Sequence, residues 1–495
     1  MLIKTNKAEF ESYLTDASNY RSGAEKLYIP ENKDELQELI KELYKENIPF
    51  TISGARTGLT GSACPDDGVI ISLEKLNEII LCNDKNKSID KDSKIVSVGA
   101  GVIHKDLDNY LHELDLFFPP NPTEANSMIG GNLGTNASGS RTFKYGATRN
   151  YVKSLKLFLS NGDEVQIKRN QILENNGKLN FSSIDNKFYS LDIEDIGMPN
   201  IKHAAGYFIK KDMDLIDLFI GMEGSLGVIY ETELEVFTSP QCLLGLIVFF
   251  DNNLDMIDFV EDIRDLSLKN NTMNSKGDIS ARLIEYFDNY SLDLLRNKYP
   301  QIDNRVLAAI WVEQEYIPID EDNLLEKWID KINKYSNLKD ETWTAMNDKE
   351  HKKFAEFRHT LPVQVYEHLS VDNEKIGTDT AVPVSEFRNY YFALYENLEL
   401  LGLPYLIFGH IGNSHLHANI FYNNEIEFKK AKDFYMDLIK NTIELGGTVS
   451  AEHGIGKLKK VYLLEMFGDK IEIMKKIKKV LDPKNLLGKG NLFDL

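Results

Sequence analysis

The amino-acid sequence predicts an α+β fold in more than one domain, and three observations support this. Over the first 240 residues, segments with helical spacing alternate with segments that have the spacing of strands. The longest apolar run, Leu243 to Phe250, then suits a buried strand. Charged, helix-rich sequence follows to about residue 400. A chain of 495 residues has room for several domains at about 150 residues each, and we place a boundary near residue 240.

The first helix is predicted just before residue 50. Asn32 and Glu35 resemble a capping box, and Pro49 stops the helix. Apolar residues repeat at helical spacing between these signals, at Leu36, Leu39, Ile40, Leu43 and Tyr44. A short strand, Phe50 to Ile52, is predicted to follow.

Further elements are predicted along the chain. Asn161-Gly162 between residues 155–159 and 164–167 is a strong hairpin signal. Residues 306–312, which include Trp311, read as a second apolar strand. Helices are predicted over about 425–445, ending at Gly446-Gly447, and over about 469–481, ending before Pro483.

The composition excludes some classes of partner. The chain has 57 basic and 77 acidic residues and a net charge of −20. Such a polyanion is repelled by phosphate backbones, so nucleic acid is excluded as the main partner. An anionic substrate would need a local, buried cluster of positive charge.

The cysteines and the apolar runs predict a location. Three cysteines without a CxxC motif cannot form a disulfide framework, which favours a reducing compartment. The first ten residues lack the apolar core of a signal peptide. No apolar run is long enough for a membrane span. We therefore expect a cytoplasmic protein, and peripheral attachment to the inner membrane and a homodimer both stay open.

Glycine is dense in three long segments of the first half. Glycine allows positive φ and a close approach of ligand to backbone, and successive N–H groups form a nest for a pyrophosphate. Neither GxGxxG nor a Walker A motif is present. The first segment alone slightly favours a turn without a ligand, and the second could be a compact surface loop. A large flat ligand would also fill the space that its small side chains leave. The segments are Ile52–Ala63, Pro119–Val152 and Gly221–Val236; a fourth, Val98–Val102, is too short to interpret alone.

Histidines gather in two short motifs, Gly409–Ile420 and Ser450–Lys457. A single histidine is usually structural, but three within eight residues, with Glu452-His453 downstream, favour a metal site. Imidazole and carboxylate ligands suit Zn²⁺, Mn²⁺ or Fe²⁺. Strand geometry alone would pair His415 with His417, because alternate residues share a face.

Together, the motifs ARTGLTGSA, PPNPTEANSMIGGNLGTNASG and GMEGSLGVIYET resemble the FAD-binding domain of the vanillyl-alcohol oxidase (PCMH-type) superfamily, in its glycolate oxidase/D-lactate dehydrogenase branch. The resemblance covers the whole chain. It implies an FAD domain of two α/β subdomains over residues 1–240. An antiparallel-sheet substrate or cap domain with a metal site would span 241–470. A C-terminal segment, 471–495, would pack on the FAD domain.

The same resemblance implies the residues that contact FAD. The first two loops would hold the pyrophosphate and flank the flavin, and the third would line the ribityl and adenosine side. Some relatives bind flavin covalently through a histidine of the first loop; this sequence has none there, which predicts non-covalent FAD. The implied residues are Ser53, Gly54, Ala55, Arg56, Thr57, Gly58, Pro122, Gly130, Gly131, Gly134, Asn136, Ser138, Gly139, Gly224, Gly227 and Ile229.

The resemblance also implies a second set of residues, which would act on the metal and the substrate. His410, His417 and Glu452 would bind a divalent metal, zinc or manganese. His415 stands where relatives carry an asparagine that contacts substrate, so it is either a substrate contact or an alternative ligand. His453 matches the base that takes the hydroxyl proton. Two basic residues would bind substrate: Arg358, which matches an arginine that clamps the carboxylate, and Lys375.

These expectations predict an FAD-dependent dehydrogenase. It would oxidise a small D-2-hydroxy acid to the 2-oxo acid by hydride transfer to flavin N5, with D-lactate as the first candidate and glycolate or D-2-hydroxyglutarate as others. Electrons would leave to a quinone, a cytochrome, an electron-transfer flavoprotein or oxygen. Two alternatives are a flavoprotein of the same fold without net oxidation, like the ether-lipid synthases, and a metal-dependent hydrolase that uses the histidine and glutamate cluster.

Overall fold

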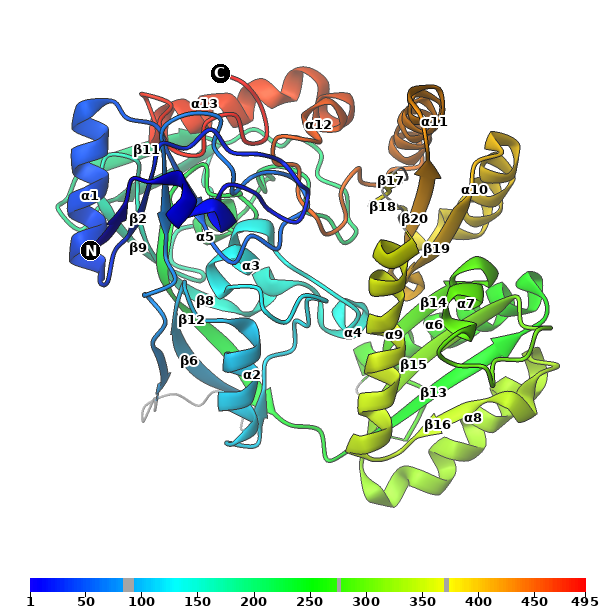
Figure 1. Ribbon diagram of the computed structural model, residues 1–495. Helices are drawn as coiled ribbons and strands as arrows, with labels where there is room; N and C mark the ends of the chain where they lie inside the picture. Colours follow the sequence, from blue (N-terminus) through cyan, green and yellow to red (C-terminus); the bar gives the residue numbers. More distant parts are fainter. Residues whose placement is uncertain (83–92, 274–276, 369–373) are drawn as a thin grey trace. The chain divides into compact units, whose positions relative to one another are not determined.

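The computed structural model describes residues 1–82, 93–273, 277–368 and 374–495 (Figure 1). The chain forms two compact units. Unit 1 consists of residues 1–138, 147–239 and 450–495, and unit 2 consists of residues 139–146 and 240–449. The functional domain boundaries near 240 and 470 stay a prediction.

The first sheet of unit 1 has the strand order β1-β2-β4-β3, with its inner strands parallel. Asn32 caps helix α1, because its side chain accepts hydrogen bonds from the N–H groups of Asp34 and Glu35. Asn47, which has a left-handed backbone conformation, ends this helix. The apolar positions predicted for this helix, up to Leu43, are buried against the sheet. The elements are β1 (Leu2–Lys4), β2 (Lys26–Ile29), α1 (Lys33–Glu46), β3 (Phe50–Ser53) and β4 (Val69–Ser72).

The second sheet of unit 1 has the order β5-β6-β12-β8-β9, with β7 beside β12, and its pairs are antiparallel. The predicted hairpin joins β8 to β9, with Gly162 at φ 82°. The elements are β5 (Ile79–Cys82), β6 (Ser93–Gly99), α2 (His104–His112), β7 (Leu116–Phe117), α3 (Ile129–Thr135), β8 (Val152–Phe158), β9 (Glu164–Lys168), β10 (Lys178–Ser182), β11 (Phe188–Asp192), α5 (Leu215–Leu218) and β12 (Val228–Thr238).

The C-terminal segment packs on unit 1, as predicted. The Leu486 carbonyl accepts a hydrogen bond from the N–H of Phe50 at 2.8 Å. Buried Asn491 donates to the carbonyls of Ser62 at 2.9 Å and Glu223 at 3.0 Å. The segment, 471–495, contains α13 (Ile471–Leu481), which ends before Pro483, and α12 (Lys460–Phe467) precedes it.

Unit 2 is built on an antiparallel sheet in the order β16-β13-β15-β14-β19-β20-β17, with β18 also on β20. This confirms the antiparallel sheet that the resemblance implied. The strands are β13 (Cys242–Phe250), β14 (Ala281–Asp288), β15 (Ala308–Tyr316), β16 (Trp343–Ala345), β17 (Glu374–Gly377), β18 (Thr380–Ala381), β19 (Tyr405–His410) and β20 (His415–Tyr422).

Helix α9 lies over one face of this sheet (Figure 1). Its Phe357 contacts Phe287 and Trp343 edge to face, and Phe408 and Phe421 belong to the same apolar core. Because side chains alternate along a strand, His410 shares the core face with Phe408.

The helices of unit 2 are α4 (Thr142–Tyr145), α6 (Asn253–Met273), α7 (Asn289–Arg296), α8 (Glu321–Tyr335), α9 (Asp348–His368), α10 (Phe387–Leu401) and α11 (Glu425–Glu444).

Within the described ranges of the chain, no helix combines the length and the apolar composition that a membrane crossing requires.

Candidate functional site

Unit 1 contains a cavity of about 280 Å³ whose wall comes mainly from four stretches of the chain, with Leu73 and Ala100 in addition. The turn after β3, helix α3 with the residues around it, and the turn before β12 form most of the wall. Two side chains of the loop Ser450–Lys457, Glu452 and His453, complete it. The cavity therefore joins the three glycine-rich segments to one of the histidine motifs.

Most residues predicted to contact FAD line this cavity; Asn136 and Gly139 do not. Asn136 ends α3 in a left-handed conformation and accepts a hydrogen bond from the N–H of Arg149. Gly139 begins a segment of unit 2, which Lys144 anchors to Glu315 at 2.8 Å. The remaining predicted residues are Ser53, Gly54, Ala55, Arg56, Thr57, Gly58, Pro122, Gly130, Gly131, Gly134, Ser138, Gly224, Gly227 and Ile229, all in the wall.

The wall fits a large ligand with polar groups. A Cβ placed on Gly58, Gly131 or Gly134 would have no heavy atom within 4 Å, so these glycines face open space. The buried hydroxyls of Ser53 and Ser127 line the same cavity and have no hydrogen-bond partner among the described residues. Small residues and unused polar atoms together suit the flat ring and the pyrophosphate of a dinucleotide.

The loop Ser450–Lys457 presents Glu452 and His453 to the cavity. It bends at Gly454 and Gly456, which have φ of 78° and 50°. The carboxylate of Glu452 forms an ion pair with the buried ammonium of Lys202 and accepts a hydrogen bond from Ser138 Oγ at 2.9 Å. Lys202 thus balances the charge of this carboxylate within unit 1.

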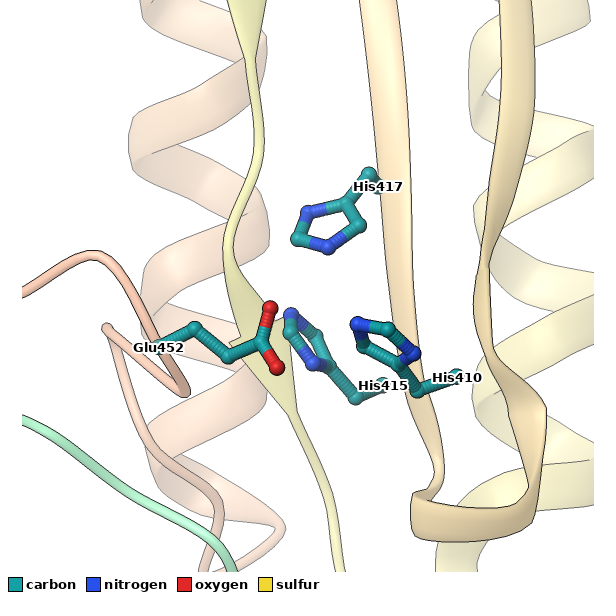
Figure 2. A group of neighbouring side chains, drawn as sticks. All are labelled: His410, His415, His417 and Glu452. Atoms are coloured by element: carbon teal, nitrogen blue, oxygen red, sulfur yellow. The ribbon is translucent and has the colours of Figure 1, made fainter. Parts of the chain in front are cut away.

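In unit 2, three imidazoles face one another from two neighbouring strands (Figure 2). The register of β19 and β20 sets His410 opposite His415, and His417 lies two residues further along the same face. The ring centroids are 5.4 Å apart for His410 and His415, 5.7 Å for His410 and His417, and 4.3 Å for His415 and His417. One nitrogen of each ring lies within 4.8 Å of a nitrogen of each other ring.

Neighbouring acceptors orient these rings. Nδ1 of His410 lies 2.5 Å from Oε1 of Glu285, and Nδ1 of His417 lies 3.1 Å from the carbonyl oxygen of Thr378. A carbonyl oxygen only accepts, so Nδ1 of His417 carries a proton, and the neutral ring then has its lone pair on Nε2. His415 has the opposite orientation, with Nε2 3.2 Å from Oδ1 of Asp379.

Glu285 also holds Arg358, on α9. Its Oε2 lies 3.1 Å from Nε of Arg358, whose guanidinium lies 4.9 Å from the centre of the Phe408 ring. Burial by itself raises the pKa of Glu285, but the charge and hydrogen bond of His410, and then those of Arg358, hold this pKa below its ordinary value. Arg358 is buried, and its Nη1 has no hydrogen-bond partner among the described residues.

Lys375 lies on β17, at the edge of the same sheet. Its Nζ donates a hydrogen bond to Oδ1 of Asn419 at 2.6 Å, and Asn419 is two residues beyond His417 on β20. Burial lowers the pKa of Lys375 to about 8. Unit 2 thus brings together the three histidines and Arg358, with Lys375 connected to β20 through Asn419.

Sequence reasoning missed three charged residues that contact the candidate residues. Glu285 is an acid between two apolar pairs, Leu283-Ile284 and Tyr286-Phe287, and this was a usable signal, because a buried charge needs a partner. Asp379 lies in the segment 374–387, where only Lys375 was singled out. Lys202 carried no signal, because its partner Glu452 is 250 residues away.

The three imidazoles also suit a divalent metal. Nitrogen donors in this arrangement match the ligands that Zn²⁺ and Mn²⁺ take in proteins. Acceptors on the far side of the rings, such as Glu285, are the usual partners of metal-binding histidines. This donor set fits a metal ion without identifying one.

Two sequence families match the chain. The family described as FAD binding domain matches residues 24–168. The family described as FAD linked oxidases, C-terminal domain, matches residues 259–492. The first match contains β3 and α3 of the cavity wall, and the second contains β14, α9, β19 and β20.

Among curated proteins, the chain is 28% identical to glycolate oxidase subunit GlcD of Bacillus subtilis, over 97% of this chain and 92% of that protein. It is 26% identical to D-lactate dehydrogenase of Archaeoglobus fulgidus, over 94% of this chain and 90% of that protein. It is 24% identical to D-2-hydroxyglutarate dehydrogenase of Stutzerimonas stutzeri, over 94% of this chain and 90% of that protein.

Among solved structures, an alkyldihydroxyacetonephosphate synthase has a similar fold, with a TM-score of 0.67 and 16% identity over 98% of this chain and 81% of that chain. At this identity the likeness concerns the fold alone. The chain therefore belongs to the FAD-linked oxidases of the PCMH-type (vanillyl-alcohol oxidase) fold, in the glycolate oxidase/D-lactate dehydrogenase branch, and is an FAD-dependent oxidoreductase.

Proposed function

We propose that the protein is a dehydrogenase that converts a small D-2-hydroxy acid to the corresponding 2-oxo acid. D-lactate is the first candidate, and glycolate and D-2-hydroxyglutarate are the next. The observation that carries this proposal is the buried guanidinium of Arg358, which has an unused Nη1 and shares Glu285 with His410. A buried positive charge with unused donors suits the carboxylate that all 2-hydroxy acids share.

Arg358 would bind the substrate carboxylate through two parallel hydrogen bonds. Glu285 occupies Nε, so the guanidinium is held in one orientation. Lys375 would add a second positive charge for a substrate oxygen. His415 either contacts the substrate or serves as an alternative metal ligand.

FAD would occupy the cavity of unit 1. The turn after β3, the residues around α3 and the turn before β12 would hold it. When bound, it supplies a two-electron acceptor for the hydride of the substrate C–H bond. We propose that it is bound non-covalently, because the loop Ser53–Gly58 contains no histidine and the cavity wall contains no cysteine.

A divalent metal, zinc or manganese, would be bound by His410, His417 and Glu452. This ligand set requires the segment that carries Glu452 to reach the histidine cluster. The metal would supply a Lewis acid that lowers the pKa of the substrate hydroxyl. The proposal is supported by the hydrogen bonds at Nδ1 of His410 and His417, which leave Nε2 of each ring to bind a metal ion.

His453 would take the hydroxyl proton as the substrate is oxidised. Imidazole titrates near neutrality, which suits it to this role. The electrons would then pass to a quinone, a cytochrome, an electron-transfer flavoprotein or oxygen. The relatives in sequence are oxidases and dehydrogenases, and only a likeness of fold connects the chain to a synthase, so we favour net oxidation.

Anaerobic mixing of the purified protein with D- and L-2-hydroxy acids tests the function. We expect D-lactate or another small D-acid to bleach the flavin absorbance and to yield one 2-oxo acid per flavin. The L-acids should react much more slowly. If none of the acids bleaches the flavin, the dehydrogenase proposal is wrong. A flavin-dependent reaction without net oxidation of the substrate then explains the site better.

The variant His453→Ala tests the base. We expect the flavin to stay bound and its reduction by the best acid to slow by about 10³-fold, which is the usual contribution of a general base. The measurement is stopped-flow absorbance under anaerobic conditions. His112→Ala, at the exposed end of α2, is the matched control and should react normally. Undiminished bleaching in His453→Ala would remove the assigned role.

Acid precipitation tests how FAD is held. We expect the yellow colour to appear in the supernatant and the pellet to be colourless, because the loop Ser53–Gly58 contains no histidine and the cavity wall contains no cysteine. Absorbance at the flavin band in both fractions gives the answer. Colour that remains with the precipitated polypeptide contradicts non-covalent binding.

Elemental analysis of histidine variants tests the metal site. We expect about one Zn or Mn per chain in the wild type, and a loss of most of it in His410→Ala and His417→Ala, with the flavin retained. His415→Ala separates its two roles: retained metal with a raised KM indicates a substrate contact, and lost metal indicates a ligand. His112→Ala again serves as control. A full metal content in both His410→Ala and His417→Ala refutes the ligand set.

A further inference from the structure

Glu223 is a buried acid that the proposed function does not use. It lies in the motif GMEGSLG and lines the cavity of unit 1. Its side chain is nearly inaccessible, with 5% exposure, and its backbone is left-handed, with φ of 51°. Burial raises the pKa of this carboxyl to about 7, although backbone hydrogen bonds oppose the increase. A carboxyl buried at this cost needs specific partners.

Two of those partners are backbone groups of the loop that follows His453, and the hydroxyl of Thr60 donates a longer hydrogen bond of 3.5 Å to Oε2. Oε1 of Glu223 accepts a hydrogen bond from the N–H of Ile455 at 2.7 Å, and Oε2 accepts one from the N–H of Gly456 at 2.8 Å. The backbone of Glu223 is held in turn, because its N–H donates to the carbonyl of Gly134 on α3 at 2.7 Å. A single residue thus connects the glycine-rich wall to the loop.

The loop packs closely on this carboxylate. A Cβ on Gly454 would lie 2.8 Å from Cδ of Glu223, and one on Gly456 would lie 2.2 Å from the carbonyl oxygen of Thr60. Both glycines have positive φ, and glycine has more backbone freedom to lose than any other residue. Without the two hydrogen bonds, these glycines would leave the neighbouring His453 poorly fixed.

We propose that Glu223 is a positioning residue, whose carboxylate holds the loop Gly454–Gly456 and thereby fixes the imidazole of His453 at the cavity wall. The inference rests on the role of His453 in the proposed function. Glu223 itself takes no proton from the substrate. It acts through the geometry of the loop, and small displacements of a catalytic group are known to slow reactions by large factors.

The test uses Glu223→Gln in the full-length holoenzyme. Glutamine offers one acceptor oxygen, and its amide N–H₂ would face a backbone N–H. We expect bound flavin and KM to stay within about twofold of wild type, while the rate of flavin reduction by the best hydroxy acid falls about 30-fold, within the range for a misplaced group. Glu231→Gln is the matched control: Glu231 lies on β12 outside the cavity wall and pairs with Lys156.

The outcomes separate the two proposals. If His453→Ala is inactive and Glu223→Gln reduces flavin at the control rate, the positioning inference fails and the proposed function stands. If His453→Ala is fully active, the role of His453 fails and the positioning inference fails with it, whereas the dehydrogenase function fails only if no hydroxy acid bleaches the wild-type flavin. A third outcome is that Glu223→Gln loses bound flavin, has a raised KM and reduces flavin slowly, all to a similar extent. This would indicate only a structural role and would also overturn the inference.

Hydrogen exchange covers the case in which the variant does not fold. In the wild-type holoenzyme, the amides of Ile455 and Gly456 should be protected, because both donate to Glu223. Exchange of these two amides at the rate of an unstructured loop refutes the inference without any variant. Glu223→Asp, which keeps the charge but is one methylene shorter, should show the same selective loss of rate.

Discussion

The register between β19 and β20 is the constraint on which the candidate site of unit 2 depends. It sets His410 directly opposite His415 and brings His417 to the same face. Side chains alternate along a strand, so a slip of one residue would turn a strand's histidines to the other face of the sheet. The apolar core under α9, which includes Phe408 and Phe421 from these strands, specifies the register, because a slip would expose it. Core packing therefore determines the position of the polar residues.

The second constraint is the burial of charge. Glu285 is fully buried and is shared by His410 and Arg358. An isolated buried carboxylate is very unfavourable, and a network of this kind is stabilising only if its groups find partners. In unit 1, Lys202 has the same relation to Glu452. Each unit thus contains a charged side chain that is oriented before any ligand binds, and Arg358 still has an unused donor.

The sequence allowed the prediction of what lies close along the chain. The capped helix before Pro49, the hairpin at Asn161-Gly162 and the strand Leu243–Phe250 depend on neighbouring residues, and the structure has all three. The glycine segments pointed to a cavity wall for the same reason. Contacts between distant segments could not be predicted: β14 brings Glu285 to His410 by strand pairing over 125 residues. Asn136, predicted to contact FAD, ends helix α3 and is not among the residues of the cavity wall.

The choice between the two histidine pairs can be argued from hydrogen bonds. Strand geometry alone favours His415 with His417, whereas the resemblance favours His410 with His417. In the structure, Nδ1 lies within hydrogen-bonding distance of an acceptor in both His410 and His417, whereas in His415 it is Nε2 that lies near a carboxylate, 3.2 Å from Oδ1 of Asp379. When an acceptor contacts Nδ1 of two imidazoles, both rings can present the same atom, Nε2, to a common metal ion. His415, with Nε2 directed at a carboxylate, is oriented differently, and this favours a role toward the substrate.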